Sequence, residues 1–105
     1  MLNSKQIDFY NLNGYLSVDH VFSDSQIKLL SDITNEFVEK SRSVTEENDM
    51  FALESDHSAS NPRLTRIKSP HKFHSIYEQA MKDEKMLDIL QHLIGKDIRL
   101  QGTKL

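Results

Sequence analysis

Residues 93–105, with the sequence LIGKDIRLQGTKL, decide how the fold is read. The apolar periodicity of the preceding residues stops at Ile94, and Gly95 is the residue type that most often ends a helix. Apolar and polar residues then alternate over residues 98–105, which predicts a β-strand. A strand with unpaired backbone groups is unfavourable, so we expect this strand to open a sheet, and the chain to be the first portion of a larger domain.

Four upstream segments carry the signals of helices. Residues 4–12 predict a short helix, and Ser23 with Gln26 fits a capping box that opens a longer one. A further helix is predicted over residues 69–81, with its first serine as the cap and the following proline in the first turn. The last is predicted over residues 83–94, where six apolar side chains form one wide face.

Extended structure is predicted at two places before the C-terminal strand. Residues 15–22 alternate after an Asn-Gly turn and predict a short strand, and residues 63–68 predict a short extended piece. Residues 44–62 show no period and predict a long loop that is either functional or mobile. Helices followed by the opening strand of a sheet predict an α+β fold.

Composition excludes several classes of protein. The net charge is −3, without a basic stripe, so we expect no nucleic-acid partner. The chain has no cysteine, which excludes disulfides and thiolate metal sites. The N-terminus lacks the apolar run of a signal peptide, and no window reaches the length of a membrane span. We expect a soluble, cytoplasmic chain.

Candidate catalytic and metal-binding groups were tested against the geometry that each chemistry needs. None of the five histidines has Asp or Glu two positions later, as a His-x-Asp iron site requires. His71, His74 and Glu78 share one predicted helical face and could chelate a metal, but a surface or packing role is the more common one. The adjacent residues 56–58, Asp-His-Ser, cannot adopt the geometry of a hydrolytic triad. The sequence therefore predicts no catalytic residue and no metal ligand.

Two polar groups could contact a ligand. Arg63, Arg66 and Lys68 precede a predicted helix N-terminus, where an anion would be attracted; a solvated basic strand is the simpler interpretation. Gln101 and Thr103 share one face of the C-terminal strand and could line a pocket, although an ordinary half-exposed strand is the simpler interpretation.

Three segments carry a resemblance to a known family. They are NGYLSVDHVFSDSQIKLL at 13–30, NPRLTRIKSPH at 61–71 and LDILQHLIGKDIRLQGTKL at 87–105. In this order they resemble the N-terminal third of the phytanoyl-CoA dioxygenase family. The resemblance implies an Fe(II)- and 2-oxoglutarate-dependent dioxygenase with a double-stranded β-helix, or jelly-roll, core. Residues 1–105 would then be the incomplete N-terminal portion of such a domain.

The resemblance also implies site residues. Lys68 matches a family lysine that contacts 2-oxoglutarate, and Gln101 matches a glutamine that lines the co-substrate pocket. The family's iron ligands, a His-x-Asp pair and a later His, and its carboxylate-binding arginine have no match here and are expected downstream. The complete enzyme would hydroxylate a small organic or acyl substrate, whereas residues 1–105 alone are expected to be inactive and to bind neither Fe(II) nor 2-oxoglutarate tightly.

A second hypothesis belongs to a different class. The chain could be a small helical protein-interaction module without catalysis. The acidic loop at residues 44–58 and the exposed apolar helix faces would then be its partner surfaces.

Overall fold

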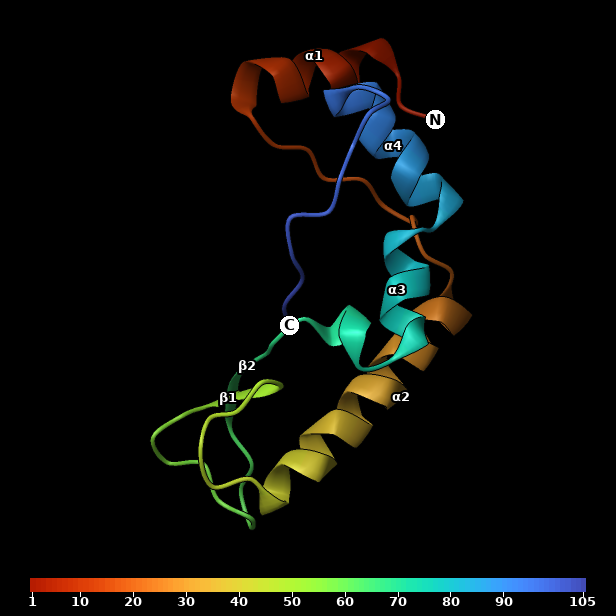
Figure 1. Cartoon of the computed structure of the whole chain (residues 1–105). Helices are drawn as coiled ribbons and strands as arrows, with labels where there is room; N and C mark the ends of the chain where they lie inside the picture. Colours follow the sequence, from red (N-terminus) through yellow and green to blue (C-terminus); the bar gives the residue numbers. More distant parts are fainter.

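The computed structural model describes all of residues 1–105. Its elements, in chain order, are α1 (Ser4–Asn13), α2 (Asp24–Lys40), η1 (Ser41–Ser43), β1 (Phe51–Leu53), β2 (Leu64–Ile67), η2 (Pro70–Lys72), α3 (Ser75–Met81) and α4 (Glu84–Ile94). The two strands pair antiparallel, with Phe51 opposite Ile67. Four α-helices and an open two-stranded sheet confirm the predicted α+β class (Figure 1).

Local side-chain chemistry explains where the long helices begin and end. Ser23 accepts the backbone N–H of Gln26, whose side chain accepts the Ser23 N–H, so the predicted capping box of α2 is confirmed. Asp83 caps α4 as expected, and Gly95, with φ of 98°, follows its last residue. No helix is both long and apolar enough to cross a membrane.

Two predictions upstream of the C-terminal segment were wrong. Residues 15–18 are irregular and residues 19–22 form a turn and a bend instead of a strand, because no neighbouring segment pairs with them. The single helix predicted over residues 69–81 is divided into η2 and α3. Ser69 stands at the N-cap position of η2 but its side chain makes no capping hydrogen bond, because it takes a left-handed conformation, with φ of 47°, in place of the extended one that a capping serine adopts. His74 caps α3 instead, accepting the N–H of Ile76.

The predicted strands at the sheet also need correction. Residues 98–105 do not form a continuous strand, and only Lys104 makes a bridge, with Lys68 of the segment that follows β2. The missed strand β1 lies inside the predicted loop of residues 44–62. By contrast, the extended piece predicted at residues 63–68 contains β2 and is confirmed.

A small core lies where α2 and α3 cover the sheet. It contains four buried side chains: Phe37 of α2, Phe51 of β1, Ile67 of β2 and Tyr77 of α3. The Tyr77 hydroxyl lies 2.7 Å from the hydroxyl of Thr34, so its polar end is satisfied. Only 8 of 105 residues are buried, which leaves most of the chain outside this core.

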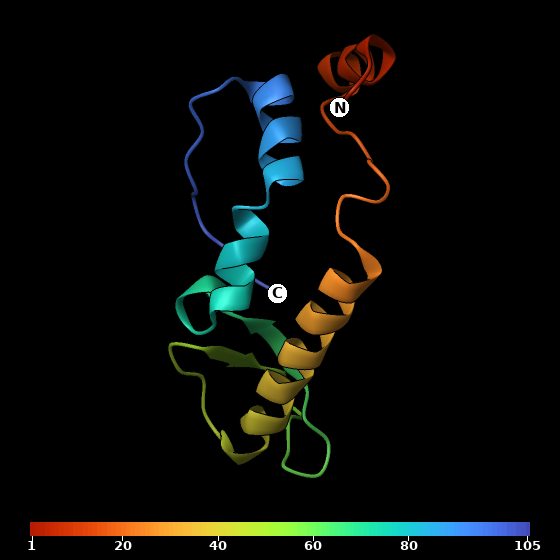
Figure 2. The same cartoon turned by 90° about the vertical axis from the view of Figure 1, so that its right-hand side faces the viewer.

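The chain is elongated for its length. Its principal extents are 49 × 28 × 22 Å and its radius of gyration is 16.8 Å, whereas a compact domain of this length has a radius of about 13 Å. Its accessible surface is 7792 Å², about 1,700 Å² above the value expected for a compact protein of its mass. Figures 1 and 2 show the cause: α1 and α4 extend far from the sheet, and the main helix contact of α1 is with α4.

Candidate functional site

The C-terminal residues lie along the edge of β2 that β1 leaves open. Ile67 and Leu105 exchange two backbone hydrogen bonds, of 2.9 and 3.1 Å, and the N–H of Ser69 donates to the carbonyl of Thr103 at 3.1 Å. The N–H of Lys68, between them, donates to the carbonyl of Met50 on the β1 side at 2.7 Å. Residues 67–69 are therefore bonded on both sides, to Met50 on one and to the C-terminal segment on the other, and Figure 1 shows the C-terminus beside β2.

Lys68 is held by the loop that precedes β1. Its Nζ donates to the backbone carbonyl of Asn48 at 3.0 Å and lies 3.5 Å from a carboxylate oxygen of Glu47. The Lys68 side chain is 29% exposed, whereas that of Glu47 is 62% exposed and free to turn into solvent. This lysine is thus a half-buried cation with one mobile counter-ion, which an incoming carboxylate can replace.

Gln101 lies in the segment between α4 and the bridge at Lys104. Its side chain is exposed and has no hydrogen-bond partner within the chain, so its amide is free to contact a ligand. The structure pairs Lys68 with Lys104, and Gln101 lies three residues before this bridge in the same C-terminal segment. The roles of Lys68 and Gln101 stay predictions.

The basic residues before the helix are only partly available to an anion. Arg63 is paired with Asp56 at 2.5 Å, and Lys68 with Glu47 at 3.5 Å. The positive charge that the sequence places before η2 is therefore largely compensated by carboxylates of the preceding loop.

His71 and His74 have structural partners. The Nδ1 of His74 accepts the backbone N–H of Ile76, and the Nδ1 of His71 lies 2.5 Å from the hydroxyl of Thr103. No group of three or more His, Cys, Asp or Glu side chains in the structure could hold a metal ion. His71, His74 and Glu78 therefore do not form a chelating set.

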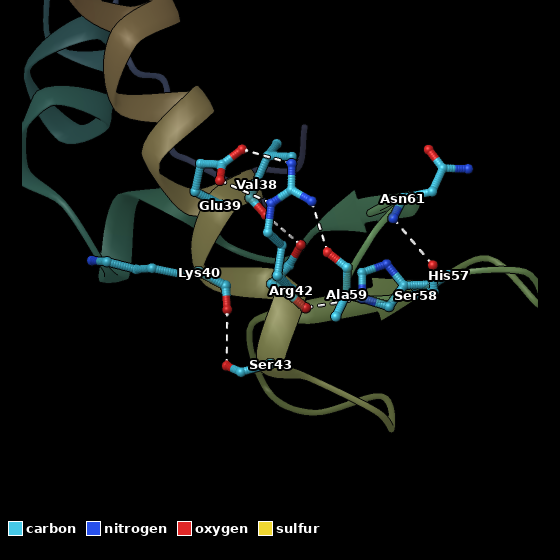
Figure 3. Close-up of polar contacts among 10 residues, drawn as sticks. Val38, Glu39, Lys40, Arg42, Ser43, His57, Ser58, Ala59 and Asn61 are labelled. Atoms are coloured by element: carbon cyan, nitrogen blue, oxygen red, sulfur yellow. Dashed lines mark hydrogen bonds and ion pairs between the residues drawn. The ribbon is translucent and has the colours of Figure 1, made fainter.

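His57 fastens the loop after β1 to the end of α2 (Figure 3). The ring accepts the backbone N–H of Arg63 at Nδ1, 2.8 Å away, so its Nε2–H donates to the carbonyl of Ser41 at 2.9 Å. Arg42 adds a second fastening, because one of its guanidinium nitrogens donates to the carbonyl of Ala59 at 2.7 Å. The Asp-His-Ser stretch is thus part of a structural contact. We call this contact the latch; it consists of His57 and Arg42 with the backbone groups that they bind, those of Arg63, Ser41 and Ala59.

Replacing His57 by alanine is expected to release this loop. The variant loses two hydrogen bonds, which we expect to cost about 1–3 kcal/mol of local stability, although the carbonyl of the buried Ser41 keeps the N–H of Val44 at 2.9 Å. Amide hydrogen exchange at Arg63 and Asn61 measures the effect. His92→Ala, which removes a ring bonded only within α4, is the matched control. Equal rates of amide exchange at Arg63 in His57→Ala and His92→Ala would contradict the role of His57 in holding this loop.

The same latch contains an ion pair with a measurable titration. The hydrogen bond from Arg42 to Glu39, 2.8 Å at Nε, lowers the pKa of the Glu39 carboxyl below its ordinary value of 4.5. Because the folded pKa lies below the unfolded one, the stabilisation is present above pH 4.5 and is lost as the pH falls through the lowered pKa. Carboxyl NMR titration is expected to show a lower Glu39 midpoint in the native chain than in Arg42→Gln; coincident midpoints would refute the pairing.

Comparison with known proteins places this geometry in context. No family model matches the chain. It is 26% identical over 93 residues to a protein of Stutzerimonas stutzeri described as "Probable alpha-ketoglutarate-dependent hypophosphite dioxygenase". The chain is similar to a 2-oxoglutarate-dependent dioxygenase. The match covers 88% of the chain but only 32% of this dioxygenase relative, so the chain spans about a third of the relative's length.

Such a dioxygenase uses Fe(II) and 2-oxoglutarate, and the residues of this chain suit the second of these groups but not the first. An Fe(II) site needs His and carboxylate donors that converge, and these residues supply no such cluster. A 2-oxoglutarate carboxylate needs a cation or amide donors, which Lys68 and Gln101 can supply. The chain therefore fits a contribution to co-substrate binding and does not fit an iron centre of its own.

Proposed function

We propose that this chain is the N-terminal portion of an Fe(II)- and 2-oxoglutarate-dependent dioxygenase of the phytanoyl-CoA dioxygenase family. The observation that carries the proposal is the match to the S. stutzeri relative, whose name states dependence on alpha-ketoglutarate, which is 2-oxoglutarate. The match spans 93 residues and includes most of the three segments on which the family resemblance rests.

The shape of the chain supports an incomplete domain. Ile94 and Leu100, on either side of the helix-ending glycine, are 58% and 50% exposed. Such apolar surface, with an open sheet and an excess of accessible area, is typical of elements that pack against further structure. In the complete enzyme, strands of a jelly-roll core would cover these surfaces.

In the proposed enzyme these residues build one wall of the co-substrate site. Lys68 would bind a carboxylate of 2-oxoglutarate in place of Glu47, and Gln101 would offer its amide. The iron and its oxidative chemistry would depend on ligands outside residues 1–105. The half-burial of Lys68 favours the role, since a carboxylate binds more strongly to a partly desolvated cation.

The proposed substrate is a small molecule. The relative is named for hypophosphite, a small phosphorus oxyanion, and that substrate belongs to the relative. An organic or acyl substrate, as the family resemblance implies, stays a prediction for this chain. The two substrate classes give different products and are separated by assay.

Turnover by the full-length natural protein that contains these residues tests the proposal. The purified protein would be supplied with Fe(II), ascorbate and 2-oxoglutarate, and succinate would be measured with hypophosphite, acyl-CoA thioesters and small carboxylic acids as substrates. We expect succinate formation that one substrate class stimulates. Absence of succinate with correctly folded, iron-loaded protein would refute the function.

The isolated chain of residues 1–105 separates this function from the alternative of a helical interaction module. As part of a larger domain, it is expected to elute as aggregated or expanded species in size-exclusion chromatography, because its apolar faces are uncovered. A sharp monomer peak with a cooperative thermal transition would favour the interaction module instead.

A further inference from the structure

One side-chain hydrogen bond ties residues 96–105 to the rest of the chain. It joins Nδ1 of His71 to Oγ1 of Thr103 over 2.5 Å, between partly buried groups 32 positions apart in sequence. We propose that His71 is a positioning residue, which acts through Thr103 to fix the register of the C-terminal segment, which carries Gln101, against Lys68 in the proposed co-substrate wall. This inference rests on the proposed function and extends it to a residue that touches neither Fe(II) nor 2-oxoglutarate.

The backbone before His71 is shaped to deliver its ring to Thr103. Ser69 adopts φ of 47° and ψ of 54°, a left-handed conformation that is strained for a residue with a side chain. The turn ends β2 and starts η2, and the carbonyl of Ser69 accepts the N–H of Lys72 at 2.9 Å. The chain is thereby reversed so that His71 lies over the C-terminal segment.

Thr103 is consequently held at two atoms. Its carbonyl accepts the N–H of Ser69 at 3.1 Å, and its hydroxyl pairs with His71. Backbone hydrogen bonds can form in several registers because every residue carries the same backbone groups. A bond to the Thr103 side chain forms in one register only, and so selects it. Gln101 is two residues before Thr103, so the register that His71 selects also sets the position of Gln101.

The selected register has an electrostatic cost. It places Lys104 opposite Lys68 in an antiparallel bridge, where side chains share one face and like charges repel. Glu47 lies near Lys68 and offsets part of this repulsion, but Lys104 has no ion pair. A contact that maintains an otherwise unfavourable register is more consistent with a requirement of the site than with stability alone.

The backbone N–H groups of residues 67–69 donate in turn to opposite neighbours, which supplies an internal control for an exchange experiment. The N–H groups of Ile67 and Ser69 donate to the C-terminal segment, whereas that of Lys68 donates to Met50. Amide hydrogen exchange in the full-length natural protein would therefore report the two sides of this segment separately.

We expect His71→Ala and Thr103→Val to accelerate exchange at Ile67 and Ser69 by about 3- to 10-fold, with Lys68 unchanged. His71→Asn, which retains a polar atom near the position of Nδ1, is expected to restore most of the protection. His92→Ala is the matched control, because its ring bonds only to Asp88 within α4. Exchange at Ile67 and Ser69 in His71→Ala no faster than in His92→Ala would overturn the proposal.

A kinetic measurement separates positioning from structure. In the full-length natural protein, His71→Ala is expected to raise the KM for 2-oxoglutarate about 5-fold or more with a smaller change in kcat, and His71→Asn to recover it. Faster exchange with an unchanged KM would show a merely structural contact and would overturn the proposal. Failure of the proposed function is recognised separately, as absence of 2-oxoglutarate turnover by the unsubstituted protein.

Discussion

Replacing Phe37 by alanine in the full-length natural protein is expected to abolish cooperative folding of the sheet and the two helices that cover it. Phe37 is 4% exposed, and its ring centroid lies 6.0 Å from that of Tyr77 and 6.4 Å from that of His74. A buried Phe→Ala substitution costs about 3–5 kcal/mol. A core of four buried residues cannot offset a loss of this size, so we expect a broad, non-cooperative urea transition in far-UV circular dichroism.

The same helix offers a matched control. Ile27 belongs to the apolar period of α2, but the structure leaves it 51% exposed. Ile27→Ala is expected to change stability by less than about 1 kcal/mol, because little apolar area is lost and alanine favours the helix. Equal urea midpoints for the two variants would show that the core is not centred on Phe37.

Lys68→Gln is expected to raise the KM for 2-oxoglutarate by about 10- to 100-fold in the full-length natural protein, since a hydrogen bond to a charged group contributes about 1.5–3 kcal/mol. The substitution keeps the length of the side chain but removes its charge. Lys68→Arg retains a cation of different shape. Its KM is expected to lie between that of the unsubstituted protein and that of Lys68→Gln. KM and kcat from initial rates of succinate formation measure the effect.

Two further variants distinguish co-substrate binding from a structural role of Lys68. Glu47→Gln removes the carboxylate that competes for Nζ and is expected to lower the KM. Lys72→Gln removes an exposed, unpaired lysine nearby and is expected to leave the KM unchanged. A KM that does not respond to Lys68→Gln, or that rises equally in Lys72→Gln, would exclude Lys68 from the 2-oxoglutarate site.

The long helices could be predicted because their signals are local. Ser23 and Gln26 lie three positions apart and satisfy each other's backbone, so the start of α2 is encoded within one turn. Gly95 ends α4 for a similarly local reason, its positive φ. The periodicity of α2 was less informative about burial, since Ile27 follows the apolar spacing and is still exposed. Burial depends on the neighbouring element, which periodicity does not identify.

The sheet and the details of the site could not be predicted in the same way. β1 has three residues, too few for alternation to be recognised, and it exists because β2 pairs with it. The contacts of His57 and His71 join segments 16 and 32 positions apart, and no local pattern announces them. Lys68 and Gln101 were identified by resemblance to a family, whereas their surroundings, including the competing Glu47, required the structure.

The alternating hydrogen bonds of residues 67–69 have a consequence for synthesis in the cell. The second neighbour of β2 is made more than thirty residues after it, so during translation this edge stays bare while the intervening helices emerge from the ribosome. Ribosome-bound nascent chains are therefore expected to recruit chaperones most strongly in the interval before Thr103–Leu105 leaves the exit tunnel.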